Sequence, residues 1–381
     1  MTKQWSVVSG QWSVFSGLCA LLLAFAPFGL SASHVFQRER VEMTERALQY
    51  LAAQVQEYGY VGDSRPRAVT ALFILAALSD GVEPGVGVVG AAVDKASDWL
   101  LDQGGSGCLG GAEEPHEDHA LIALALQQLT GMMSTTTPVI ARSVSTTKQP
   151  SAGGELSNIN RVLFHASLDA LQYSLDAQDK GSQPAYSGGW TPDTLNRVGN
   201  RTLTAWFLMQ VNGAEAWQAR IPAGSRGRAR AFMLASQKGM DAEKEAERGG
   251  FSVDASGLPV RSSTAAGAWT LSHEEPDGIA MRSASDWLRR NPPVWYGPHF
   301  FPTHFFATRA LWRTRHDDDG AAFAAYFSRV TRLLRERQQS DGAIPFPPGH
   351  GEPLLAMGKG YSTAMAILIL NADRGLLPLD Q

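Results

Sequence analysis

The sequence predicts an all-α fold, a ring of six inner and six outer helices known as an (α/α)6 toroid. One observation is the pentapeptide ASDWL, which occurs at 96–100 and again at 284–288. A second is that amphipathic segments alternate along the chain with segments that are apolar nearly all round. Self-similarity at a period of roughly 50–60 residues indicates a repeat architecture, in which each unit buries its apolar face against its neighbours.

Each repeat contains two helices joined by a glycine-rich loop. The first helix has an apolar stripe on one side, as in Leu48, Leu51 and Val55, and faces solvent on the other. The second helix is apolar nearly all round and must be buried. The six first segments with their loops are 47–60, 96–111, 170–190, 231–251, 284–297 and 330–346; the six second helices are 67–78, 117–129, 201–211, 261–271, 303–312 and 361–370.

The pattern favours a closed ring over an open solenoid. An open stack of repeats needs a polar capping face on its terminal helices. The last apolar helix, with the run AMAILIL at 364–370, has no such face. We therefore expect the first and last repeats to meet, and we expect Trp99 and Trp287 of the two ASDWL copies to pack inward against inner helices.

The repeats also resemble a known superfamily. SLDAQ…SGGW (174–190), LASQ…RGGF (234–251) and RERQQSDGAIPF (335–346) are similar to the QW-type repeats of the prenyltransferase and squalene-cyclase superfamily. The resemblance spans nearly the whole chain after its N-terminal segment and implies the (α/α)6 toroid of terpenoid cyclases and protein prenyltransferases. It carries little about activity, because unrelated activities use this ring.

The N-terminal 33 residues have a different character. Lys3 is their one charge, and the apolar run 14–32 ends in Ser31-Ala32-Ser33, which is typical of a signal-peptide cleavage site. We predict an exported protein, periplasmic or secreted, with a membrane anchor over 14–32 as the alternative. Residues 34–381 are predicted to form one domain with a mobile Ser/Thr-rich insertion at about 131–158.

Composition excludes one partner class. The net charge is −4 and no basic stripe occurs, so nothing indicates nucleic-acid binding.

The mouth of the ring, where the inner helices begin, is where the resemblance places an active site. Four inner helices start with Thr-Ala, at 70–71, 204–205, 264–265 and 363–364. Squalene-type cyclases carry a D-x-D-D acid directly before this pair, and that acid is absent here. The acidic run 317–319 lies at the opposite end and is most simply a helix cap.

Basic residues occupy the mouth instead. Arg67, Arg201 and Arg261 share one repeat position, and Lys359 lies close to the equivalent place. If they converge, they form a pocket for an anionic headgroup, as in the prenyltransferases that the sequence resembles. The alternative is that each arginine pairs with a loop acid such as Asp63, Asp193 or Asp254 and holds its loop in place.

Histidines and acids supply the other candidates for chemistry. His304, His350, Asp193 and Asp254 are candidate catalytic groups, because they fall in mouth loops or at inner-helix starts. His116 and His119, in the stretch CLGGAEEPHEDH (108–119), form a possible pair of zinc ligands. No other cofactor is implied, and a solvated acidic loop is the simpler interpretation of that stretch.

Aromatic residues on the inner helices give the last candidates for ligand binding. Trp206, Trp269 and Phe305 could line a cavity and stabilise a cation, as in terpene cyclases. They could equally fill the core.

Three functions remain open from the sequence. The first is a terpene cyclase or prenyltransferase-like enzyme that binds an isoprenoid or another anionic-headed ligand. The second is a secreted carbohydrate-active toroid of the lyase type, which would act on a polysaccharide. The third is a non-catalytic ring that binds a ligand or a protein.

Overall fold

The structure is a computed structural model that describes residues 36–103, 108–110, 115–134, 158–181, 187–192, 199–216, 219–239, 241–254, 256–297, 299–316, 319–349, 357–375 and 377. Regular structure in these ranges is helical, and the β-type pairs are isolated bridges, Gln237 with Phe251 and Ser252 with Pro259. The predicted all-α class is confirmed.

The chain divides into two compact units, Met1–Glu45 and Arg46–Gln381. In the first, the described residues 36–45 are helical. Arg38 pairs with Glu42 one turn later at 2.9 Å, and Thr44 Oγ1 donates to the Arg40 carbonyl at 3.0 Å. The helix continues to residue 58, and residues 46–58 belong to the second unit, which contains the repeats.

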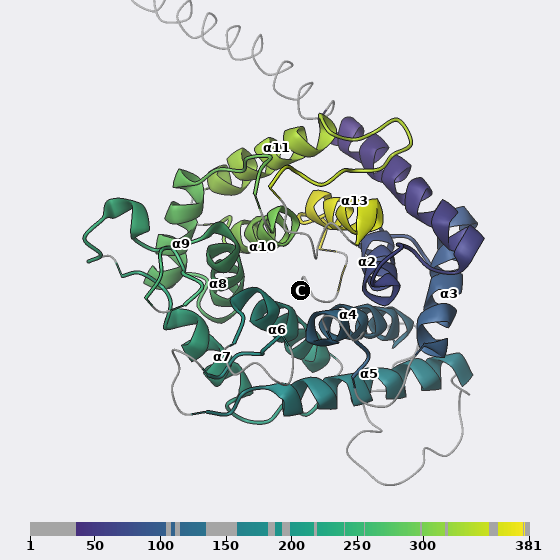
Figure 1. The fold of residues 1–381 in the computed structure, drawn as a ribbon, viewed down its shortest axis with the longest axis horizontal. Helices are drawn as coiled ribbons and strands as arrows, with labels where there is room; N and C mark the ends of the chain where they lie inside the picture. Colours follow the sequence, from purple (N-terminus) through teal and green to yellow (C-terminus); the bar gives the residue numbers. More distant parts are fainter. Residues whose placement is uncertain are drawn as a thin grey trace, which may run out of the picture. The chain divides into compact units, whose positions relative to one another are not determined.

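The second unit contains a closed ring of inner helices (Figure 1). They are α2 (Pro66–Ser79), α4 (Pro115–Ser134), α6 (Arg201–Ala216), α8 (Arg261–Glu274), α10 (Phe300–Arg313) and α13 (Gly358–Leu370). Each packs against the next, and α13 packs against α2. The six inner helices and their closure are as predicted.

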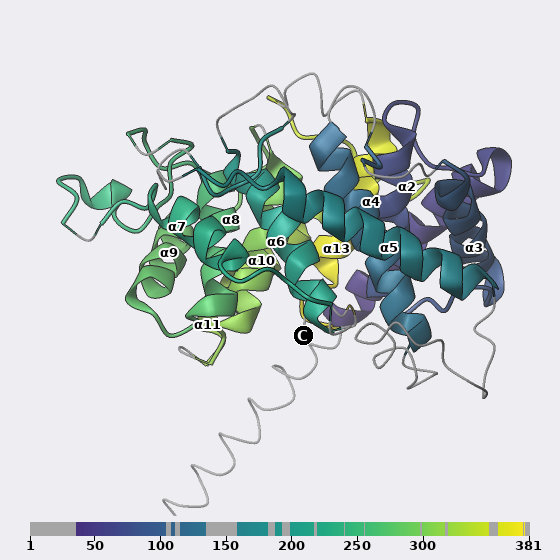
Figure 2. The ribbon, with the colours of Figure 1, turned by 90° about the horizontal axis from the view of Figure 1, so that it is seen from below.

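The outer layer consists of the helical residues 46–58 and five further helices (Figure 1). These are α3 (Gly87–Asp102), α5 (Asn158–Ala177), α7 (Ser225–Leu234), α9 (Ile279–Arg290) and α11 (Ala321–Arg335). Figure 2 shows α5 crossing in front of α4 and α6, both of which it contacts. A short 3₁₀ turn, Glu245–Glu247, lies in the loop before α8.

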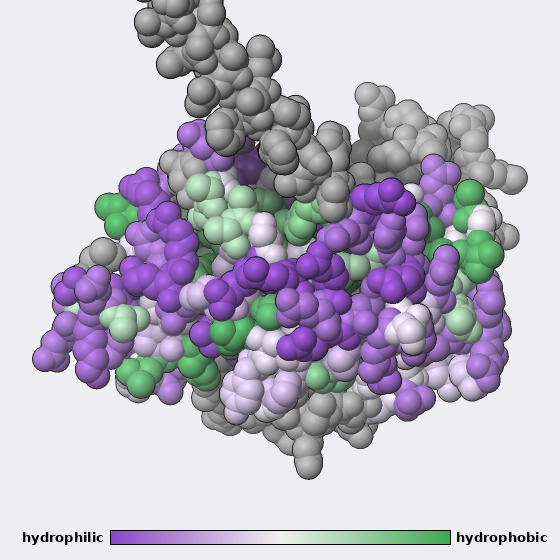
Figure 3. Space-filling view, turned by 90° about the horizontal axis from the view of Figure 1, so that it is seen from above, coloured by the Kyte–Doolittle hydropathy of each residue, from purple (hydrophilic) through white to green (hydrophobic). Residues whose placement is uncertain are grey.

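Burial follows the two hydrophobic patterns of the repeat. In α2 every residue from Ala68 to Ser79 is buried, whereas α11 buries one face, with Phe327, Val330 and Leu334. The other faces of the outer helices meet solvent, and hydrophilic residues predominate on the flank seen in Figure 3. The layers therefore form because a helix without a polar side is stable only inside a sheath.

A hydrogen bond to the loop repeats at the start of the inner helices. In four repeats the threonine of Thr-Ala accepts a loop N–H with its Oγ1: Thr70 from Val61 at 2.9 Å, Thr204 from Trp190 at 3.1 Å, Thr264 from Phe251 at 2.9 Å and Thr363 from Ile344 at 2.9 Å. All four hydroxyls are buried, so each bond satisfies a backbone donor that water cannot reach.

The glutamine of each motif joins consecutive outer helices. Gln178 Nε2 donates to the carbonyl of Gly188 in its own loop and to that of Ser225, the first residue of α7, both at 2.8 Å. Gln237 does the same with Gly249 at 3.2 Å and Ala280 of α9 at 2.8 Å.

The paired glycines of the motif follow from this close approach. Gly188 and Gly249 have φ of 101° and 83°, a region that favours glycine. A Cβ on Gly249 would also lie 2.2 Å from the Ser283 carbonyl oxygen of α9.

The two ASDWL tryptophans pack on loops of the preceding repeats. Trp99 lies 5.0 Å from Tyr60 between ring centroids, and Trp287 Nε1 donates to the Ala246 carbonyl at 2.9 Å. In each case the contact is with a segment that leads into an inner helix, before α2 for Trp99 and before α8 for Trp287. The two copies of the pentapeptide therefore have the same structural role.

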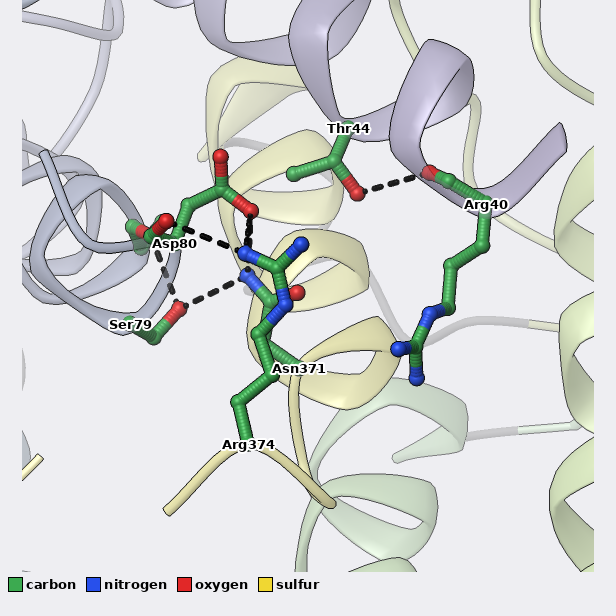
Figure 4. A network of polar contacts seen from close by, with 7 residues as sticks. Arg40, Thr44, Ser79, Asp80, Asn371 and Arg374 are labelled. Atoms are coloured by element: carbon green, nitrogen blue, oxygen red, sulfur yellow. Dashed lines mark hydrogen bonds and ion pairs between the residues drawn. The ribbon is translucent and has the colours of Figure 1, made fainter. Parts of the chain in front are cut away.

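Polar contacts close the ring between its first and last inner helices. Asn371, just after α13, donates from Nδ2 to Ser79 Oγ at 3.2 Å, and Arg374 pairs with Asp80 (Figure 4). On the outer layer Arg46 donates to Gln338 Oε1 at 2.5 Å. These bonds join residues almost 300 positions apart in sequence.

Several predictions concern residues outside the described ranges. They are the signal peptide or anchor at 1–33 and most of the insertion at 131–158, of which 131–134 continue α4 and 158 begins α5. Within the described ranges, no helix combines the length and apolarity needed to cross a membrane.

Replacing Thr264 with valine should destabilise the protein by about 1–3 kcal/mol, because the buried Phe251 N–H loses its acceptor without a change in side-chain size. Urea unfolding of the variant measures this. Ser256→Ala, at an exposed loop position, is the control and should change stability by less than about 0.5 kcal/mol. Equal, small effects in both variants would show that the repeated bond does not hold the loop.

Candidate functional site

The three repeat-equivalent arginines reach toward different segments at the mouth. Arg67 Nη1 donates to the Leu109 carbonyl at 3.5 Å, in the loop before α4. Arg201 Nε donates to Ser236 Oγ at 2.5 Å, and its Nη1 donates to the Val253 carbonyl before α8. Arg261 is exposed, and its charge acts on His304 of α10. Arg67 and Arg201 thus tie their helices to the loop of a following repeat.

Burial makes Arg201 the least ligand-like of the three. Its residue is 2% exposed, and its guanidinium lies over the Phe232 ring at 4.5 Å. Desolvation lowers the pKa of Arg201 to about 10, against the opposing effect of Asp254. Those contacts fit a residue that holds the loop at 252–254.

The structure places the remaining basic and acidic candidates as follows. Lys359 is exposed and donates to Gln339 Oε1 at 2.8 Å. Asp254 closes a turn by accepting the N–H groups of Ser256 at 2.9 Å and Gly257 at 2.6 Å. Bonds from Ser256 and Gly257 lower the pKa of Asp254. The candidates Asp193 and His350 lie outside the described residues.

His304 points away from the centre of the mouth. It is buried on α10, and its Nδ1 shares a hydrogen bond of 2.7 Å with the Tyr326 hydroxyl of the outer helix α11. Desolvation, aided by Arg261, lowers the pKa of His304 to about 3. The imidazole is therefore neutral and joins the two layers.

His119 occupies the threonine position of the second repeat. Its Nδ1 accepts the Leu109 N–H at 3.0 Å, as the threonines accept their loop N–H groups. Nε2 then carries the proton and lies 3.0 Å from both the Ala170 carbonyl oxygen and Ser174 Oγ. Aligning His119-Ala120 with the four Thr-Ala pairs is the sequence signal that identifies this role.

His116 is similarly saturated with protein contacts. Its Nδ1 donates to the Thr191 carbonyl at 2.6 Å, so its Nε2 is the acceptor for the Tyr173 hydroxyl at 3.0 Å. Zinc at this pair would require breaking hydrogen bonds to both rings. No group of three or more His, Cys, Asp or Glu side chains suited to a metal occurs among the described residues.

The aromatic candidates pack on one another inside the ring. Trp206 of α6 stacks on Phe305 of α10 at 4.7 Å, although α8 separates these helices in the ring. Trp269 of α8 lies 5.7 Å from Phe306, and Arg309 covers Phe305 at 4.0 Å. These aromatic contacts across the interior of the ring place Trp206, Trp269 and Phe305 in the core.

The mouth contains a different polar cluster, centred on Glu117 in the first turn of α4. Arg65 Nη2 lies 3.0 Å from Glu117 Oε2, and Arg65 Nε donates to Asp118 Oδ1 at 2.8 Å. The side chains of Arg65 and Asp118 are 5% and 2% exposed, whereas Glu117 is 23% exposed. Asp118 therefore anchors the guanidinium, and Glu117 is the carboxylate that a ligand can reach.

Three further helices bring groups toward Glu117. Arg65 precedes α2, His299 precedes α10, and Tyr361 lies in the first turn of α13. Partial desolvation lowers the pKa of His299 against the effect of Glu117, so this solvent-accessible imidazole is neutral near pH 7. Burial raises the pKa of Tyr361, and the negative charge of Glu117 raises it further, so the hydroxyl stays protonated.

Backbone strain marks the same place. Arg65 and His299 have φ of 51° and 59°, and neither side chain caps its own helix. Left-handed backbone at a non-glycine residue costs of order 1–3 kcal/mol and gathers at functional sites. The side of the mouth formed by α4, α2, α13 and α10 thus combines a reachable carboxylate and an exposed, neutral imidazole with a buried guanidinium and a buried phenol.

Comparisons with known proteins leave the family open. No family model matches the chain, and no curated protein matches it. Two solved structures are similar: a glycosidase variant in complex with glucose, with a TM-score of 0.47, and a second glycosidase variant, with a TM-score of 0.46. Each is 11% identical to this chain, covers 91% of it and is itself covered to 99%.

Both TM-scores lie below 0.5, and nothing about function follows from them. The helical ring implied by the resemblance to prenyltransferases and squalene cyclases is present. Membership of that superfamily stays a prediction.

The neutral state of His119 predicts a pH dependence. Desolvation lowers the pKa of His119 from 6.5 to about 4. Its contribution to stability is therefore complete above pH 6.5 and is lost as the pH falls toward 4, because the unfolded chain binds the proton first. His119→Asn keeps an acceptor near the Nδ1 position but does not titrate.

Between pH 7 and 4.5 the wild-type protein should lose on the order of 2 kcal/mol more than His119→Asn, measured by urea unfolding at both pH values. The exposed residue His316, replaced by asparagine, is the control and should leave the wild-type slope unchanged. Parallel slopes for the wild-type protein and His119→Asn would contradict the assignment.

Proposed function

We propose that the protein is a carbohydrate-active toroid that binds its sugar substrate around Glu117. The observation that carries this proposal is the reachable Glu117 carboxylate, held by Arg65 where four inner helices begin. A sugar offers hydroxyls that both donate and accept, and this cluster supplies an acceptor carboxylate held by a guanidinium, together with an exposed imidazole.

The charge pattern supports a neutral or weakly charged ligand more than a diphosphate. The three arginines expected to hold an anionic headgroup make contacts in three separate directions, and Arg201 is committed to its loop. At the Glu117 site the cation Arg65 is already paired with two carboxylates, so a polyanion would meet an acidic cluster.

The aromatic contacts inside the ring also favour a saccharide over an isoprenoid ligand. An isoprenoid chain needs an apolar chamber beneath the mouth, and the aromatic residues expected to line it contact one another across the ring. Binding at the mouth needs no such chamber.

Within this proposal Glu117 is the acid–base group. Arg65 orients one of its oxygens, which leaves the other to accept a proton from a substrate hydroxyl, a sugar carbon or a water. Neutral His299, which is exposed, positions substrate hydroxyls. Export remains part of the proposal, since an extracellular polysaccharide would be the accessible substrate.

Glu117→Gln tests the role directly. The variant keeps the shape and a hydrogen-bond acceptor but cannot take a proton, so we expect turnover to fall by about 100-fold or more while binding changes little. Turnover is measured as release of reducing ends or unsaturated products from a panel of soluble glucans, xylans and uronate polysaccharides. Glu83→Gln, exposed at the opposite end of the ring, is the matched control.

Each outcome separates the functions. Binding with no turnover in the wild-type protein supports a non-catalytic ring instead. Turnover that Glu117→Gln leaves intact would overturn the assignment of Glu117, and stronger binding of prenyl diphosphates than of any saccharide would overturn the carbohydrate proposal.

A further inference from the structure

Two exposed tyrosines lie on the segments that lead to the Glu117 site. Tyr58 is 57% exposed and Tyr296 is 67% exposed; among the described residues they are the large aromatic side chains left open to solvent. Both precede an inner helix, so both lie at the mouth end of the second unit, and neither is needed to fill the core.

The same two segments deliver the strained residues of the site. Tyr58 is followed seven positions later by Arg65, and Tyr296 is followed three positions later by His299. Arg65 and His299 both have positive φ and both act electrostatically or directly on Glu117. The mouth segments before α2 and α10 thus each carry an open aromatic ring beside a residue of the site.

Each ring has a close neighbour. Tyr58 lies 6.0 Å from Tyr60 between ring centroids, and Tyr60 lies 5.0 Å from Trp99. On the other segment, Gly349 has φ of 79° and passes so close that a Cβ there would lie 3.0 Å from Tyr296 Cζ. A packed aromatic group or backbone under a surface ring limits its motion, which reduces the entropy lost when a ligand stacks on it.

We infer that Tyr58 and Tyr296 are stacking subsites for sugar rings of one saccharide chain that also occupies the Glu117 site. This inference rests on the proposed function. A pyranose ring presents C–H groups on its faces and hydroxyls at its edge, which suits a flat amphipathic ring such as tyrosine. The substrate class is therefore an oligosaccharide or polysaccharide of several residues, because a single sugar ring cannot occupy both tyrosines and the Glu117 site at once.

The test measures binding of Tyr58→Ala and Tyr296→Ala. Affinity electrophoresis through gels containing soluble glucan, xylan or polygalacturonate identifies a polysaccharide that the wild-type protein binds, and calorimetry with its oligosaccharides gives dissociation constants. Each alanine variant should weaken binding of a hexasaccharide by about three- to tenfold. The monosaccharide should bind all proteins equally.

Two kinds of control isolate the aromatic contact. Tyr58→Phe and Tyr296→Phe keep the ring and should bind within about twofold of the wild-type protein. Leu258→Ala removes an apolar side chain that is 65% exposed in the loop before α8, away from the four helices of the site, and should change nothing. All these residues are exposed, so the midpoint of urea unfolding should stay unchanged in every variant.

The outcomes distinguish this inference from the function on which it rests. If the wild-type protein binds a hexasaccharide and both alanine variants bind it equally well, the subsites are wrong while the Glu117 site stands. If the wild-type protein binds no saccharide of the panel, both fail. Weakened binding that appears equally with the monosaccharide would also overturn the inference.

Discussion

The structure depends on one hydrogen bond repeated around the ring, from a loop N–H to an acceptor at the start of an inner helix. Thr70, Thr204, Thr264 and Thr363 provide a hydroxyl, and His119 provides a ring nitrogen. The bond joins the entering segment to its helix at a buried position, where the loop N–H has no access to water. The bond therefore sets where each mouth segment begins, and the side chains of the mouth follow from it.

The candidate site arises where repeats depart from the common pattern. Arg67 and Arg201 follow it and tie loops in place. In the second repeat the inner helix begins with the sequence PHEDH instead of an arginine. Glu117 and Asp118 therefore lie in the first turn of α4. Arg65, whose backbone is left-handed, pairs with both of these carboxylates. A scaffold of equivalent positions thus leaves one side of the mouth chemically distinct.

The fold could be predicted because it follows from hydrophobic periodicity, which fixes helices, burial and ring closure together. The site could not, since its geometry depends on contacts distant in sequence. Arg67, Arg201 and Arg261 occupy one repeat position yet lie in three environments set by neighbouring loops. Glu117 lay within a stretch noted for its acids, but Arg65, His299 and Tyr361 come from other helices. Nothing in the sequence signals positive φ at Arg65 or His299.

A crystal structure of the Glu117→Gln protein with a bound oligosaccharide tests the central claim most directly. A carboxamide retains the hydrogen-bonding shape of the site while preventing turnover, so the substrate should remain intact. We expect a sugar ring within about 3 Å of the residue 117 side chain, with hydroxyls facing Arg65 and His299. An oligosaccharide ordered instead beside Arg201 and Arg261, with the α4 side of the mouth empty, would contradict the claim.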